Sequence, residues 1–512
     1  RDIKNTYQVR WFWKILKTNV KSNKNLSNLI LSKKLSFMKF GRQSSHYFWS
    51  FINTGGSQFI GIVGTIAMSR FASSEHFGTV ALLSAFLLLC NVLSELGVGT
   101  TVVKLRYTDP KILSSYFWVT GFASIIIALI YFLLINKLSE LFQNGLISKY
   151  GIFIIPVIIS AGLATVPSAI IVRKQLFKLK AVMSLTANTI AVATGLVVAL
   201  LQSPMNGLMC ILILNPLILN IVIVYYVKCG IFSYFNFYLI RSQLSFSLQL
   251  LLSNLLEQLS RSAIIFGLSF VFGSSLTGIY TRAEAVRNIF SYSFDKIVQR
   301  VSLSELVRKS NQNTVAAFAE HVKISKNITL LLVPAFVFII SNAGNIIYIL
   351  FGTGWNESAG LLQAIAPTII LIPIISINLT LFKSLGLSRY VVSIKVLQVI
   401  FIVIIFFLLN EDIYTVLYSL VSMYFFIYSI SLFFLSTVEN YNFKFYKNQI
   451  LWSCLPGVLT AVIVKIAFKF EVENTIISIF FDAAIFIVVY ALSYAITKMI
   501  FDTLGDEQSS SH

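Results

Sequence analysis

The sequence contains few charged residues: only 12% of its 512 positions are Asp, Glu, Lys or Arg, against about a quarter in soluble globular domains. With 57% hydrophobic residues beside them, this composition excludes an ordinary soluble domain, whose core could not bury so much apolar surface. Histidine and cysteine are also scarce, at four each. The histidines lack metal-ligand spacing and the cysteines form no C-x-x-C pair, so we expect no zinc or haem site and no cofactor.

Acidic residues are half as numerous as basic ones, 20 against 40, which gives a formal net charge of +20. This charge invites a nucleic-acid interpretation, but its distribution argues against one. Eleven of the forty basic residues lie in the first 44 positions, and most of the others lie in short connections between apolar segments. The pattern is typical of the loops of a membrane protein, and nucleic acid is not an expected partner.

The basic, aromatic segment over residues 1–44 has no apolar core or cleavage site of a signal peptide. It is predicted to be a cytoplasmic tail that rests on anionic lipid, and the alternative is a partner-binding segment.

Long apolar segments make up most of the remaining chain. About fourteen of them have roughly 20 residues, enough for a helix to cross the hydrocarbon core, and the alternation of barrel strands is absent. The predicted spans are 45–69, 78–98, 113–135, 151–172, 181–201, 206–227, 245–272, 283–304, 328–351, 359–382, 391–409, 413–436, 450–468 and 475–499. The predicted fold class is therefore an all-α polytopic membrane protein with about 14 transmembrane helices.

Basic residues collect in every second connection, such as the one with Arg173 and Lys174, whereas opposite connections such as QSPMNG and GTGWNESAG contain none. This bias predicts that both termini face the cytoplasm. The longest outer loop is expected around NKLSELFQNGLISK.

Two turns six helices apart have similar sequences: Phe71-Ala-Ser-Ser precedes Gly78, and Phe272-Gly-Ser-Ser precedes Gly278. The repeat predicts two six-helix lobes around a central cavity, followed by two extra C-terminal helices. The predicted domains are a cytoplasmic N-terminal tail over 1–44, an N-lobe over 45–227, a cytoplasmic linker over 228–244, a C-lobe over 245–436, two further helices over 437–500 and a cytoplasmic C-terminal tail over 501–512.

Charged residues inside the spans are the candidate functional residues, because each costs at least about 2.5–3.5 kcal/mol at membrane depth. Glu257 and Arg261 stand at i,i+4 and can form an ion pair that either lines a cavity or only packs. In the eighth predicted span, polar residues follow helical spacing along one stripe, which cannot face lipid and is expected to line a hydrated cavity. They are Glu284, Arg287, Ser291 and Asp295, with Lys296 beside them.

Two further spans carry polar candidates: Asn53 and Gln58 in the first, and Glu95 in the second, where snorkelling to the interface is the alternative. A cavity rich in arginine suits phosphate or carboxylate, and glutamates there can exchange protons. The residues thus predict an anionic substrate, with proton exchange as a hypothesis.

Four segments, in order, resemble the bacterial polysaccharide-repeat flippases. The first covers two helices from IGIVGTIAMSRFASSEHFG to ELGVGTTVVK, and the second is ATVPSAIIVRKQLFKLKAV after the fourth helix. GIYTRAEAVRNIF enters the eighth helix, and LFGTGWNESAG precedes the tenth. The resemblance covers roughly residues 41–440 and implies the fold of the multidrug/oligosaccharidyl-lipid/polysaccharide (MOP) superfamily.

The resemblance also implies a non-enzymatic flippase in the bacterial inner membrane. Such a protein carries an undecaprenyl-diphosphate-linked oligosaccharide, for O-antigen or exopolysaccharide, to the outer leaflet by alternating access. Expected partners are this substrate, membrane lipids, and the polysaccharide polymerase and chain-length regulator. We expect the substrate to contact Arg261, Arg287, Arg282, Lys296, Asn53 and Gln58. Proton coupling is expected at Glu257, Glu95 or Asp295.

Several alternatives share parts of this pattern. A multidrug/cation antiporter of the same superfamily would need an acidic, aromatic cavity, and a lipid II flippase would differ mainly in its substrate. A polysaccharide polymerase would need a large outer loop with catalytic side chains, and a channel would need a filter-like segment; neither feature is evident.

Overall fold

The computed structural model describes residues 48–49, 52–104, 109–227, 234–409, 411–438, 441–467, 484, 486–495 and 497. The predicted tails over 1–44 and 501–512, and most of the predicted fourteenth span, lie outside these residues. Every regular element within them is a helix, and the first long one covers residues 52–68. The helices that follow are α3 (Ser74–Glu95), α4 (Val98–Lys104), α5 (Pro110–Leu141), α6 (Gly145–Gly151), α7 (Ile155–Arg173), α8 (Phe177–Leu201), α9 (Pro204–Val227), α10 (Tyr238–Ser310), α11 (Thr314–Phe351), α12 (Glu357–Ile365), α13 (Thr368–Ser384), α14 (Ser388–Leu408), α15 (Ile413–Ser436) and α16 (Phe443–Ala467).

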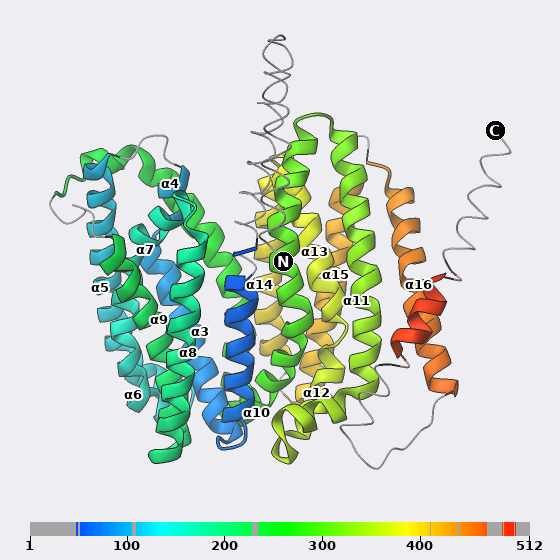
Figure 1. Ribbon diagram of the computed structural model, residues 1–512, viewed down its shortest axis with the longest axis horizontal. Coiled ribbons are helices and arrows are strands. Elements are labelled where there is room, and N and C mark those ends of the chain that lie inside the picture. The colour runs from blue at the N-terminus through cyan, green and yellow to red at the C-terminus, as the bar shows by residue number, and fades with distance from the viewer. Residues whose placement is uncertain are drawn as a thin grey trace, which may run out of the picture.

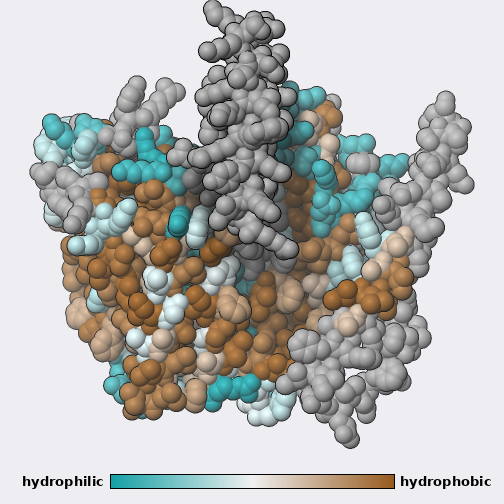
Figure 2. All heavy atoms as spheres, viewed as in Figure 1, coloured by the Kyte–Doolittle hydropathy of each residue, from teal (hydrophilic) through white to brown (hydrophobic). Residues whose placement is uncertain are grey.

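Ten helical segments among the described residues are long and apolar enough to cross a membrane. Apolar side chains form a broad belt around the visible face, and hydrophilic ones gather at its two ends (Figure 2). This distribution is the one a bilayer requires, since only apolar groups can face its hydrocarbon core. The predicted polytopic helical class is confirmed.

The helices form two bundles (Figure 1). The N-lobe contains the helix over residues 52–68 together with α3, α5, α7, α8 and α9, and the C-lobe contains α11, α13, α14 and α15. α10 passes between them and packs on both α3 and α13, while α16 lies against α11 at the edge of the C-lobe. The structure thus confirms two helical lobes, with further C-terminal helical segments at one edge.

α10 contains the seventh and eighth predicted spans in one helical element, interrupted at Gly273. There φ is 78° and ψ is 176°, a backbone conformation that favours glycine, so one residue is enough to redirect the chain. The helix resumes directly after Gly273, so the eighth predicted span, 283–304, lies inside a longer helix. The charged residues of this segment lower its mean hydropathy below that of an ordinary transmembrane span.

The prediction of a long outer loop around NKLSELFQNGLISK was wrong. α5 continues to Leu141 and α6 begins at Gly145, which leaves only residues 142–144 between them. The Asn144 side chain accepts a hydrogen bond from the Leu146 amide and caps α6. Most residues of the expected loop are therefore helical.

The two turns of the sequence repeat meet each other at one end of the molecule, which we call the closed end. A Cβ atom on Gly78 would collide with the carbonyl oxygen of Ser274, and one on Gly278 would collide with that of Ser74. The hydroxyls of Ser74 and Ser275 are 2.7 Å apart. Only glycine permits two backbones to approach this closely, so the repeat marks a contact between α3 and the second half of α10.

A second contact crosses the closed end from the C-lobe. The Trp355 indole N–H donates to the carbonyl of Ser69 at 3.0 Å, and Arg70 donates to the carbonyl of Ile349 at 2.9 Å. The Trp355 ring meets Phe77 edge to face, with centroids 5.3 Å apart. Hydrogen bonds, aromatic packing and backbone contact thus all join the lobes at this end.

We predict that Gly78→Ala lowers the stability of the protein, because its Cβ would overlap a backbone atom that cannot move aside as a side chain could. The expected cost is about 1–3 kcal/mol, as for other overpacked sites. Gly344→Ala is the matched control, since a Cβ there has no neighbour within 4 Å. Thermal unfolding of both variants in detergent checks the prediction, and equal midpoints would contradict it.

Candidate functional site

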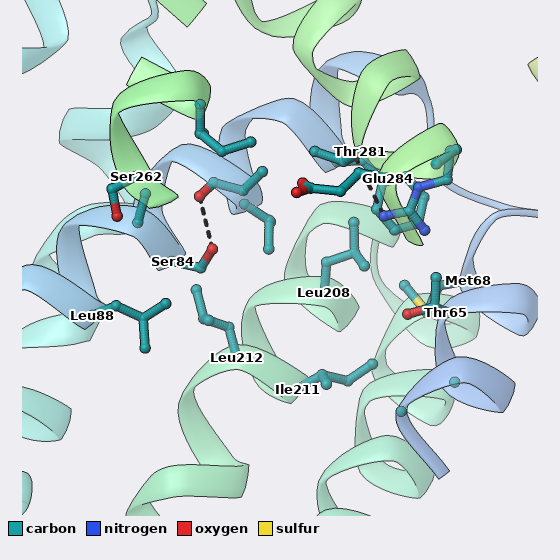
Figure 3. Close-up of a pocket in the computed structure, with 18 of the residues that line it drawn as sticks. Thr65, Met68, Ser84, Leu88, Leu208, Ile211, Leu212, Ser262, Thr281 and Glu284 are labelled. Atoms are coloured by element: carbon teal, nitrogen blue, oxygen red, sulfur yellow. Dashed lines mark hydrogen bonds between the residues drawn. The ribbon is translucent and has the colours of Figure 1, made fainter. Parts of the chain in front are cut away.

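A cavity of about 490 Å³ lies between the N-lobe and α10, and we call it the central cavity. Thr281 and Glu284 of α10 lie on one side of it, and Leu208, Ile211 and Leu212 of α9 lie on the other (Figure 3). The two other charged residues in its wall are Arg261 and Arg282, both from α10. The central cavity therefore combines an apolar wall from the N-lobe with a charged wall from α10.

Arg282 is the most unusual residue of this cavity. Only 7% of the residue is exposed, and its Nε and Nη1 atoms are buried without a hydrogen-bond partner among the described residues. Its remaining terminal nitrogen lies 3.5 Å from the Thr281 hydroxyl. The described part of the chain places no carboxylate within ion-pair distance of the guanidinium.

Aromatic rings from both sides of the closed end surround this guanidinium. Its central carbon lies 3.8 Å from the ring centroid of Phe77 in the N-lobe, and 5.5 and 5.7 Å from those of Phe351 and Trp355. Cation–π contacts contribute about 0.5–2 kcal/mol each, whereas removing an ion from water costs several kcal/mol. The rings offset only part of that cost, so the buried charge of Arg282 is incompletely compensated by the described residues.

Arg261 and Glu257 form an ion pair at 2.7 Å one helical turn apart, as the sequence suggested. Their side chains are 43% and 42% exposed, so the pair is not sealed in a dry contact. Arg261 lines the central cavity and also a second cavity inside the C-lobe. The pair therefore lies at the junction of two cavities.

The second cavity, the C-lobe cavity, has a volume of about 280 Å³. It lies between α10, α13, α14 and α15, and the polar stripe predicted in the eighth span faces it through Glu284, Arg287 and Ser291. Arg287 donates to Glu284 at 2.8 Å and to the side-chain oxygen of Asn288 at 2.9 Å. The other charged residues in its wall are Glu257, Arg261, Lys383 and Lys395.

The remaining predicted site residues lie apart from these two cavities or outside the description. Glu95 lines a third cavity, of about 450 Å³, between α4 and α7 of the N-lobe. Asn53 and Gln58 line none of the three cavities, and α8 packs on their helix through a hydrogen bond from Asn188 to the Ser57 carbonyl. The side chains of Asp295 and Lys296 lie outside the described residues.

Sequence reasoning missed several residues of these sites. The aromatic cage of Arg282 was not predicted, although Phe77 and Trp355 belong to the family-like segments. Lys395 lies four residues inside the predicted span 391–409 and lines the C-lobe cavity. Its charge within an apolar run was the available signal. Among the described residues, no group of three His, Cys, Asp or Glu is placed to hold a metal ion.

Comparisons with known proteins agree with this geometry. A family model described as "Polysaccharide biosynthesis protein" matches residues 67–360, more than half of the chain. A search of curated proteins finds no match. Among solved structures, the lipid II flippase MurJ in an inward closed conformation superposes with a TM-score of 0.75 at 14% identity, over 88% of this chain and 98% of that one.

Multidrug transporters also share the fold. An inward-facing MATE family transporter of the MOP superfamily superposes with a TM-score of 0.57 at 15% identity, over 78% of this chain and 95% of that one. A MOP superfamily transporter from Pyrococcus furiosus, described as having a binding pocket of reverse polarity, superposes with a TM-score of 0.51 at 15% identity, over 80% of this chain and 95% of that one. At such low identity, these similarities establish a common fold only. The substrate has to be inferred from the residues that line the cavity.

Proposed function

Because the chain belongs to the polysaccharide biosynthesis protein family and has the fold of MOP superfamily transporters, we propose that it is a flippase for a lipid-linked oligosaccharide. Its substrate is an undecaprenyl-diphosphate-linked repeat unit of an O-antigen or exopolysaccharide. It moves this unit from the cytoplasmic to the outer leaflet of the bacterial inner membrane. Both chain termini face the cytoplasm, and the closed end faces outward.

The observation that carries this proposal is the buried guanidinium of Arg282 in the central cavity. A diphosphate cannot cross hydrocarbon with its charge exposed, and an arginine fork replaces the lost water with charge-assisted hydrogen bonds. A phosphate that approaches Arg282 meets a guanidinium whose Nε and Nη1 donors have no hydrogen-bond partner among the described residues. The apolar wall from α9 suits the start of the polyprenyl chain, which extends from the cavity into lipid.

Transport then requires the lobes to alternate between two arrangements around this cavity. In the arrangement seen here, the glycine contact and Trp355 hold the closed end together. Binding of the diphosphate to Arg282 competes with its aromatic cage and so weakens one of the contacts that join the lobes there. Proton exchange at Glu257 or Glu95 returns the empty protein to its starting state.

A reconstitution experiment tests the proposal. The full chain is placed in liposomes with a trace of undecaprenyl-diphosphate-linked oligosaccharide, and a membrane-impermeant oxidase reports the sugars that reach the outside. We expect the protein to accelerate their appearance at least about tenfold, and to leave the same sugar on undecaprenol, without the diphosphate, near the rate of empty liposomes. Equal rates for both lipids would contradict the proposed role of the cation.

The same liposomes discriminate the neighbouring functions. Excess lipid II should compete weakly if the oligosaccharide is the substrate, and strongly if the protein is a lipid II flippase. A cation antiporter is disfavoured because it needs free carboxylates to bind its substrate. Glu257 and Glu284 are already paired with Arg261 and Arg287.

A further inference from the structure

The C-lobe cavity carries more positive than negative charge. Its wall contains four basic residues, Arg261, Arg287, Lys383 and Lys395, and two acidic ones, Glu257 and Glu284. Four positive and two negative charges leave a formal excess of +2 at this site. Charge at membrane depth is costly unless it is compensated, so the cavity favours an anionic occupant.

The arrangement of these groups shows where that occupant would bind. Both carboxylates already pair with arginines, at 2.7 Å for Arg261 with Glu257 and 2.8 Å for Arg287 with Glu284. The Nε atom of Arg287 is nevertheless buried without a hydrogen-bond partner in the described part of the chain, and only 7% of the residue is exposed. An unsatisfied guanidinium donor in the wall of a cavity is suited to an acceptor from a ligand.

The rest of the wall resembles a sugar site more than a site for a simple ion. Hydroxyls and amides from four helices line it, and they can donate to and accept from sugar hydroxyls. They are Ser260, Asn288, Ser291, Ser376, Thr380, Gln398 and Tyr424. The volume of about 280 Å³ lies just under the range of roughly 300–1,000 Å³ for small-molecule sites. One sugar ring suits it better than an oligosaccharide.

The C-lobe cavity adjoins the central cavity, since Arg261 and Glu284 line both. Arg282 and Arg287 are five residues apart on one helix, about 7.5 Å along its axis and about 140° around it. They therefore face different cavities, with about one and a half helical turns between them along the axis. A lipid-linked oligosaccharide whose diphosphate contacts Arg282 can thus extend a sugar toward Arg287.

We propose that the C-lobe cavity is a second anion subsite, which receives a carboxylate-bearing sugar ring of the repeat unit. The proposal rests on the proposed flippase function and narrows its substrate class to acidic oligosaccharides. Arg287 and the two lysines bind the carboxylate. Hydroxyl and amide side chains bind the ring hydroxyls, and Glu257 and Glu284 hold the two arginines in place.

Binding of free monosaccharides to the purified full chain tests this subsite without any lipid. Sodium D-glucuronate, D-glucose, sodium chloride and sodium phosphate are titrated at matched ionic strength, and the thermal unfolding midpoint and the heat of binding are measured. We expect glucuronate to bind saturably and at least about tenfold more tightly than glucose or chloride. Phosphate binding at Arg282 should not respond to substitution of Lys383 or Lys395. The variants Lys383→Gln and Lys395→Gln should each weaken glucuronate binding several-fold, and Lys395→Arg should retain it. Arg308→Met should leave it unchanged, because Arg308 lies on the surface and lines none of the three cavities.

Other results would overturn the assignment. Equal binding of glucose and glucuronate would remove the role of charge. Chloride or phosphate binding that is as tight as glucuronate binding, and is weakened in the same way by Lys383→Gln and Lys395→Gln, would assign the cavity to a free inorganic anion. Undiminished glucuronate binding in the double variant Lys383→Gln/Lys395→Gln would place the ligand elsewhere. Failure of the flippase itself is distinguishable, because it would abolish the liposome activity while glucuronate binding persists.

Discussion

A disulfide between α3 and the second half of α10 is expected to stop transport. In the double variant Ser74→Cys/Ser275→Cys, made in a background with Cys90, Cys210, Cys229 and Cys454 replaced by alanine, oxidation should lower the liposome activity at least about tenfold. The two serine hydroxyls are 2.7 Å apart, so the introduced sulfurs lie within reach of each other. The bond would hold the closed end together while the transport cycle requires it to open.

Reduction of the disulfide should restore the activity, which separates locking from misfolding. The matched control is Ser57→Cys/Ser184→Cys, whose hydroxyls are 3.1 Å apart inside the N-lobe. This second disulfide joins two helices of one lobe and should leave transport intact. Full activity of the oxidised Ser74→Cys/Ser275→Cys protein would show that the lobes need not separate at this end.

Replacement of Arg282 should make the protein more stable and less active. Arg282→Met removes a buried guanidinium that has no carboxylate partner in the described residues and fills its space with an apolar chain. Substituting buried charges by apolar residues of similar volume stabilises proteins by up to about 1–4 kcal/mol. Since the phosphate loses its main donor, we expect transport of the lipid-linked substrate to fall at least about tenfold.

Two measurements on the same preparation check this prediction: the thermal unfolding midpoint and the initial rate in liposomes. Arg308→Met is the control, because Arg308 lies on the surface, with a side chain 63% exposed, and lines none of the three cavities. Arg282→Lys should retain part of the activity, as it keeps the charge without the planar fork. A destabilised Arg282→Met protein, or one of normal activity, would show that the guanidinium serves only the packing of its aromatic cage.

The lobes could be predicted from the sequence because their cause is local. Each apolar run is long enough to span a bilayer, and the two Phe-x-Ser-Ser turns mark equivalent positions in the two halves. The start of the eighth helix could not be predicted from the sequence, because the single residue Gly273 takes the place of a loop between the seventh and eighth helices. Hydropathy does not report how sharply a backbone can turn.

The candidate site was predicted in part. Glu284, Arg287 and Ser291 share a cavity because spacings of three and four residues place side chains on one helix face. Arg282 was predicted to share their site. Its angular position on the same helix is different, so it lines the central cavity. Lys383 and Lys395 could not be assigned to this site from sequence, because the apolar faces of α13 and α14 carry no signal of which neighbours they pack on.

The contact at the closed end is reciprocal. Gly78 faces Ser274 while Gly278 faces Ser74. Gly278 is 200 positions after Gly78 and Ser274 is 200 positions after Ser74, so each glycine faces the serine of the other half. A pairing of this kind is isologous, the signature of a two-fold axis. A polypeptide consisting of one lobe could therefore form the same junction with a second copy of itself. The closed end retains the symmetry of such a homodimer within a single covalent chain, and a substitution on either side of the axis alters the fit of both.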